Sequence, residues 1–94
     1  MKQVTLNGKK MTDRNSAHVY IASKLGFPEY YGKNLDALFD CVSEFCLDKY
    51  IRFSHFDEAK KNLGDYADKL CTVFFDIADT NPRIKFKVLP YSEA

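Results

Sequence analysis

Two aspartates, Asp36 and Asp40, are the residues whose types and spacing in this 94-residue chain most directly suggest chemistry. Four residues apart on a helix, two side chains point within about 40° of each other, so both carboxylates would share one face. Paired carboxylates can act as general acid and base, provided that one of them is desolvated and its pKa is raised. They can also form an acidic surface that binds a basic partner. The surrounding sequence must decide between these two uses.

The other reactive residue types give little support to an enzyme. His18 and His55 are the only histidines; we expect the first to be structural and the second to be solvated. No G-x-S-x-G, H-E-x-x-H, Walker A or G-x-G-x-x-G motif occurs. Cys41, Cys46 and Cys71 are odd in number and form no C-x-x-C pair, so we expect reduced, half-buried thiols and neither a disulfide nor a zinc site. The sequence therefore predicts a protein without catalytic residues, metal or cofactor.

The elements that position the two aspartates follow from hydrophobic periodicity. Alternating residues predict strands, and apolar residues recurring every three or four positions predict helices. Helices between strands predict crossover connections and a parallel sheet, so we expect an α/β fold that forms a single domain over residues 1–94. The expected strands are 2–6, 49–53 and 83–89, and the expected helices are 14–25, 35–46, 55–63 and 66–79.

Local residue preferences predict where these helices begin and end. Asp13, Asn34 and Asp65 have side chains that can cap a helix N-terminus, and Ser54 begins a spacing that resembles a capping box. Gly26 suits the left-handed backbone position that follows a helix. Together these positions set Asp36 in the first turn of its helix and Asp40 one turn later.

The net charge of +1 hides an uneven distribution along the chain. Residues 25–48 contain five acidic side chains against a single lysine, Lys33. A generic nucleic-acid binder would be clearly basic, which this chain is not. One alternative stays open, because Arg83, Lys85 and Lys87 interleave with apolar residues as in single-strand binders.

The sequence predicts a protein of the cytoplasm. No apolar run approaches the roughly 20 residues that a membrane span requires, and the N-terminal residues contain no apolar segment typical of a signal peptide. We therefore expect no membrane contact.

The stretch around the aspartates resembles a known family. The string Pro-Glu-Tyr-Tyr-Gly-Lys-Asn-Leu-Asp-Ala-Leu-Phe-Asp-Cys over 28–41 resembles the barstar family, the intracellular inhibitors of secreted ribonucleases. The resemblance extends to the Val-x-Leu-Asn-Gly start, to His18 in the first helix, to the spacing of Phe56 and Lys60, and to Val73-Phe74. It implies a three-stranded parallel sheet in the order 1-2-3, packed with about four helices.

The resemblance also implies a function and a binding site. The chain would inhibit a basic, secreted, barnase-like ribonuclease one-to-one, with Asp40 in the place of a substrate phosphate. It would be a monomer when unbound and would not bind nucleic acid directly. An immunity protein for a different toxin and a nucleic-acid-binding module remain as alternatives. The implied binding residues are Tyr30, Asn34, Leu35, Asp36, Phe39, Asp40 and Ser43, together with Val73 and Asp76 on the last helix.

Overall fold

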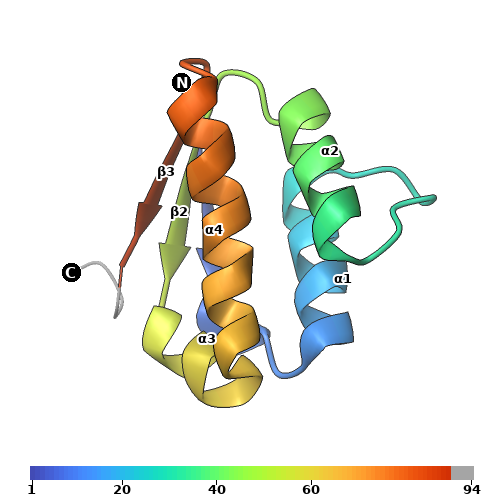
Figure 1. Cartoon of the computed structure of the whole chain (residues 1–94), viewed down its shortest axis with the longest axis vertical. Coiled ribbons are helices and arrows are strands. Elements are labelled where there is room, and N and C mark those ends of the chain that lie inside the picture. Colours follow the sequence, from blue (N-terminus) through green and yellow to red (C-terminus); the bar gives the residue numbers. More distant parts are fainter. Residues whose placement is uncertain (90–94) are drawn as a thin grey trace.

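Three long helices lie side by side in front of a small sheet (Figure 1). The computed structural model describes residues 1–89. The elements are β1 (Lys2–Asn7), the 3-10 helix η1 (Gly8–Lys10), α1 (Arg14–Leu25), α2 (Leu35–Phe45), β2 (Lys49–Ser54), α3 (Phe56–Leu63), α4 (Asp65–Thr80) and β3 (Ile84–Val88). The predicted α/β fold is confirmed: the sheet has the order β1-β2-β3, and both strand pairs are parallel. Within residues 1–89, no helix has both the length and the apolar character of a membrane span.

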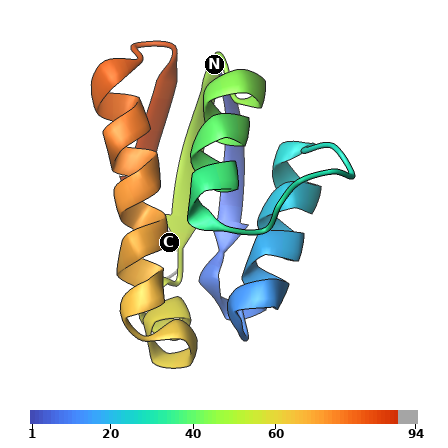
Figure 2. The same cartoon turned by 45° about the vertical axis from the view of Figure 1, so that its right-hand side comes forward.

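The sheet is covered by helices on one face (Figures 1 and 2). Its apolar side chains alternate with polar ones along each strand, as the period of two requires. On the helix-facing side, Leu6 is paired in register with Phe53, and both are fully buried. On the opposite face Thr5 and Lys87 are exposed. Because β3 is an edge strand, its exposed lysines, Lys85 and Lys87, discourage pairing with a further strand.

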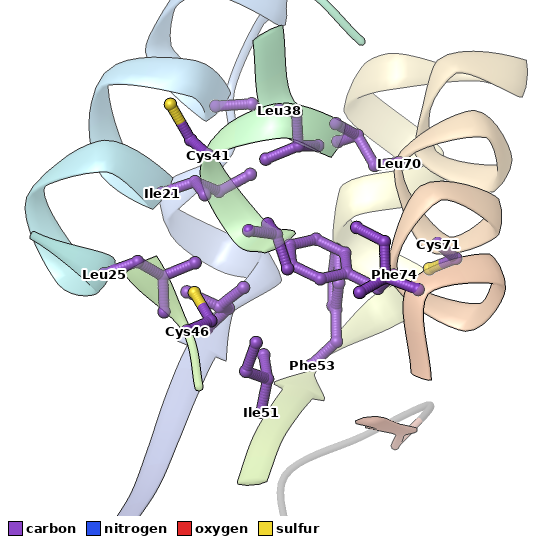
Figure 3. Packing of buried hydrophobic residues seen from close by; sticks show 14 of the residues in the cluster. Ile21, Leu25, Leu38, Cys41, Cys46, Ile51, Phe53, Leu70, Cys71 and Phe74 are labelled. Atoms are coloured by element: carbon purple, nitrogen blue, oxygen red, sulfur yellow. The ribbon is translucent and has the colours of Figure 1, made fainter. Parts of the chain in front are cut away.

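The core fills the space between the sheet and α1, α2 and α4. Figure 3 shows Phe53 from β2 and Phe74 from α4 among the side chains that fill it. Both rings are fully buried, and the Phe74 ring stacks on Phe86 of β3 with 4.8 Å between the ring centres. The inner side of α2 contributes Leu38 and Val42, which are also fully buried. This packing holds α2 in a fixed orientation and leaves its outer side to the solvent.

The predicted ends of α1 and α2 are confirmed. The side chain of Asp13 accepts a hydrogen bond from the Ser16 N–H, and that of Asn34 accepts one from the Ala37 N–H. Gly26 closes α1 in the left-handed conformation, with φ 72°. The sequence predicts these caps correctly because each capping partner lies within four residues of the cap: Ser16 for Asp13, Ala37 for Asn34 and the Ala22 carbonyl for Gly26.

The predicted caps of α3 and α4 are wrong. Ser54 is the last residue of β2, where its buried hydroxyl lies 3.4 Å from the carbonyl oxygen of Leu6, so it caps nothing. His55, half-buried and with φ 52°, takes the cap position of α3 instead. Asp65 is the first residue of α4, not its cap, and its carboxylate pairs with Lys60 at 3.4 Å. Contacts with other elements replace the local bonds that the sequence suggested.

The three cysteines are unpaired and more deeply buried than predicted. The exposed fractions are 8% for Cys41, 0% for Cys46 and 6% for Cys71, so half-buried was wrong. Burial raises the pKa of Cys46 to about 11 and that of Cys71 to about 12. These thiols act as small apolar groups of the core.

Candidate functional site

The outer side of α2 presents a row of carboxylates. Asp36, Asp40 and Glu44 follow one another at intervals of four residues and are all exposed. Like charges at this spacing destabilise a helix slightly. Asp36 lies in the first turn, where the helix dipole favours an anion, but Asp40 and Glu44 do not have this compensation. The row is therefore placed at some cost to the stability of the helix.

Phe39 and Ser43 lie beside this row. The Phe39 side chain is 44% exposed, although it is one of the largest apolar groups of the helix. The Ser43 hydroxyl is half-buried and donates a hydrogen bond to the Phe39 carbonyl oxygen at 2.8 Å. Aromatic side chains are enriched at the centre of protein interfaces, so an exposed ring on this helix marks a candidate contact.

The loop before α2 presents one tyrosine and buries the next. Tyr30 is 80% exposed, whereas Tyr31 is 6% exposed. The Tyr31 hydroxyl lies 2.6 Å from Nδ1 of His18, and the Tyr66 hydroxyl of α4 lies 2.6 Å from Nε2 of the same ring. The structural role predicted for His18 is thus confirmed, and Tyr31 anchors the loop that exposes Tyr30.

This network makes stability depend on pH. Burial, which disfavours the charged imidazolium, lowers the pKa of His18 below its usual 6.5. Below pH 6.5 the His18 imidazole binds a proton in the unfolded chain more readily than in the folded chain. We therefore expect the free energy of unfolding to decrease as the pH falls from about 6.5, by at most about 1.4 kcal/mol per pH unit for this one proton.

Urea denaturation between pH 5 and pH 8 measures this dependence. The buried phenols bring no competing titration, because burial raises the pKa of both Tyr31 and Tyr66 above its usual 10. Replacing His18 with glutamine removes the titrating group and should flatten the curve over this range. An equally steep curve in the glutamine variant would assign the dependence to another group.

A hollow brings the loop and the acidic row together. It has a volume of about 270 Å³ and lies between the loop and α2. Tyr30, Asp40 and Glu44 line it, with Tyr31 and Phe45 among the side chains of its walls. Glu44 was not among the predicted binding residues. Its spacing of four from Asp40 is the signal that could have identified it.

Leu35 and Asp36 line a second, larger cleft at the start of α2. This cleft has a volume of about 680 Å³, and its walls include Arg14, Lys33 and Lys69. None of these three cations was predicted to lie near the site. Asn34 also lines the cleft, where its side chain donates to the Gly32 carbonyl oxygen at 3.3 Å in addition to capping α2.

The two predicted residues of α4 belong to a neighbouring helix. α4 packs against α2 (Figure 1). Asp76 is exposed on α4, and Val73 is half-buried against the core. Neither residue lines the hollow beside Asp40 or the cleft beside Asp36.

Known proteins match the chain over nearly its whole length. A family model described as "Barstar (barnase inhibitor)" matches residues 1–90. The chain belongs to the barstar family. The chain is also similar to a protein of Bacillus subtilis (strain 168) named "Putative ribonuclease inhibitor YrdF". The two sequences are 31% identical over 90 residues, which cover 95% of this chain and 98% of the relative.

Two other functions, metal binding and nucleic-acid binding, find little support among the described residues of this barstar-family chain. Within residues 1–89, no three potential metal ligands lie together. In the basic segment, Arg83 is engaged by Asp48 through two contacts, Nη2 to Oδ2 at 2.6 Å and Nε to Oδ1 at 3.0 Å. Lys85 and Lys87 then remain as the exposed cations of β3. Two lysines on one strand are a weak basis for binding nucleic acid.

Proposed function

We propose that this barstar-family protein inhibits a basic, secreted, barnase-like ribonuclease by closing its active site. The observation that supports this best is the hollow between the loop and α2, because it sets the exposed Tyr30 beside the carboxylate of Asp40. An aromatic ring next to a rigidly held anion fits a pocket that binds a nucleotide. Membership of an inhibitor family and the name of the relative point to the same class of target.

The proposed mechanism is mimicry of a phosphate. A ribonuclease pocket contains donors and cations arranged to stabilise negative charge on phosphorus-bound oxygens. The Asp40 carboxylate would meet these groups without any rearrangement of them, because α2 is fixed by its buried side. Asp36 would fill a second acidic position, and Asp76 would add a third from α4.

The remaining residues of the face would exclude water and set its shape. Tyr30 and Phe39 would pack against the rim of the enzyme pocket, where aromatic side chains contribute strongly. Leu35 and Val73 would add apolar contact, and Ser43 would contribute a polar contact. Asn34 would act mainly by fixing the start of α2.

The unbound protein is proposed to be a monomer of the cytoplasm that works as a single domain. Its candidate face is polar, with exposed carboxylates at Asp36, Asp40 and Asp76, so it does not need to be covered by a second copy. A stable homodimer that buries Asp40 would contradict this.

Titration of enzyme activity tests the proposal. The cognate ribonuclease is first captured from lysate and culture supernatant of the source organism and then purified. We expect RNA cleavage to fall linearly and to stop at one equivalent of inhibitor. A captured ribonuclease that stays active with excess inhibitor would contradict the proposal. Capture of a toxin that does not cleave RNA would support the alternative of another target.

A further inference from the structure

The acidic face of α2 is bordered by a cationic cleft. Arg14 comes from the first turn of α1, Lys33 from the loop and Lys69 from α4, and all three line the 680 Å³ cleft at the start of α2. Asp36 is the one carboxylate among the lining residues. Residues widely separated in the sequence thus gather three positive charges beside a surface that is otherwise negative.

These cations have no acidic partner among residues 1–89. None of the ion pairs found there includes Arg14, Lys33 or Lys69. All three side chains are exposed, and the guanidinium of Arg14 lies 4.5 Å from the centre of the Tyr66 ring. Arg14 and Lys33 also lie at the N-terminal ends of α1 and α2, where the helix dipole disfavours a cation. Their positions are therefore unfavourable for the isolated fold.

The cleft is continuous with the proposed interface. Leu35 and Asp36, two residues of the proposed binding face, line its wall. A partner that contacts Asp36 would also cover the cleft and remove water from its cations. Covering them with a basic surface would be strongly unfavourable, since like charges at an interface repel and lose their hydration.

We propose that the partner ribonuclease places an acidic side chain, outside its catalytic pocket, into this cleft. The proposal rests on the function proposed above and adds a second recognition element of opposite sign. Arg14 offers a planar pair of donors that can bind a carboxylate through two hydrogen bonds, and Lys33 and Lys69 supply charge. The cleft would thereby select among basic ribonucleases, because one with a lysine at the facing position would be rejected.

Charge reversal in the cleft tests this proposal. Lys69→Glu and Arg14→Glu should each weaken binding of the cognate ribonuclease by at least about tenfold. Lys85→Glu is the matched control, because this lysine is exposed on the sheet face that the helices leave open and the change in net charge is the same. The control should bind within about threefold of the parent. Thermal unfolding first confirms that each variant is folded.

Rescue identifies the facing residue. Each exposed acidic residue of the ribonuclease outside its catalytic pocket is changed to lysine, and one such change should restore affinity for Lys69→Glu while weakening binding of the parent. Equal binding by Lys69→Glu and Lys85→Glu would overturn the cleft proposal. Inhibition by the parent, lost in Asp40→Ala, would show that the proposed function survives this failure.

A binding assay with single-stranded RNA separates the other possible ligand. If Lys69→Glu abolished RNA binding by the free protein while leaving the affinity for ribonuclease intact, the cleft would be an RNA site and the proposal would be wrong. Absence of RNA binding together with weakened ribonuclease binding supports it.

Discussion

Replacing Asp40 with alanine is expected to abolish most of the affinity for the cognate ribonuclease. The carboxylate is exposed in the free protein and would be desolvated and paired in the complex. Removing it would leave the enzyme's cations buried without a partner, which typically costs about 2–5 kcal/mol. This corresponds to an increase of about 30- to 5,000-fold in Kd, expressed mainly as a faster dissociation rate.

Asp57→Ala serves as the control for this measurement. Asp57 is an exposed aspartate on α3, and its loss changes the net charge by the same amount. Glu58, the next acidic residue of α3, is half-buried and is a poorer match. Surface plasmon resonance with immobilised ribonuclease gives both rates. If the Asp40 and Asp57 variants dissociate at the parental rate, the assigned site is wrong.

Replacing His18 with leucine is expected to destabilise the fold by about 2–6 kcal/mol. The ring is 1% exposed and lies between two tyrosine hydroxyls, each 2.6 Å from a ring nitrogen. Each hydroxyl that loses its partner in the interior costs about 1–3 kcal/mol. A domain of this size has a total stability of about 5–15 kcal/mol, so the change consumes a large share. Equilibrium urea denaturation measures it.

A triple variant distinguishes the lost hydrogen bonds from a simple change in packing. Tyr31→Phe and Tyr66→Phe remove the two stranded hydroxyls, so adding both to His18→Leu should recover much of the stability. No recovery would mean that the defect comes from the shape of the leucine. In the single variant we also expect weaker ribonuclease binding, because Tyr31 no longer anchors the loop that presents Tyr30.

The elements and the acidic row could be predicted because their causes are local. Asp13, Gly26 and Asn34 act within a few residues, and the spacing of Asp36 and Asp40 fixes their common face on any helix. The family resemblance then supplied the strand order, which no local pattern contains. The sequence-based predictions were wrong where contacts with distant residues fix the structure. Ser54 is an example, because its hydroxyl lies near the Leu6 carbonyl oxygen in the neighbouring strand and does not cap α3.

The parts of the site that depend on tertiary contact could not be predicted. His18 meets partners 13 and 48 residues away, and no spacing rule identifies both tyrosines. Counting charge along the sequence assigned Lys33 to an acidic segment, and no sequence pattern connected it to Arg14 or Lys69. The fold brings these three cations to one cleft, so the charge there is positive although Lys33 belongs to the acidic segment 25–48.

α1, α2 and α4 all run in the same direction, upward in Figure 1, and residues at the start of each of them line one cleft. Their peptide dipoles are therefore aligned, and their positive ends lie together. A protein of net charge +1 is then nearly neutral from afar but strongly polar at close range. The electric field of a highly charged enzyme would rotate such a dipolar molecule, but its net attraction for a nearly neutral molecule would be weak. Because physiological salt screens fields beyond about 8 Å, this turning acts only in the last moments before contact. The charge of the enzyme would thus orient the inhibitor at the point of encounter, without long-range electrostatic steering.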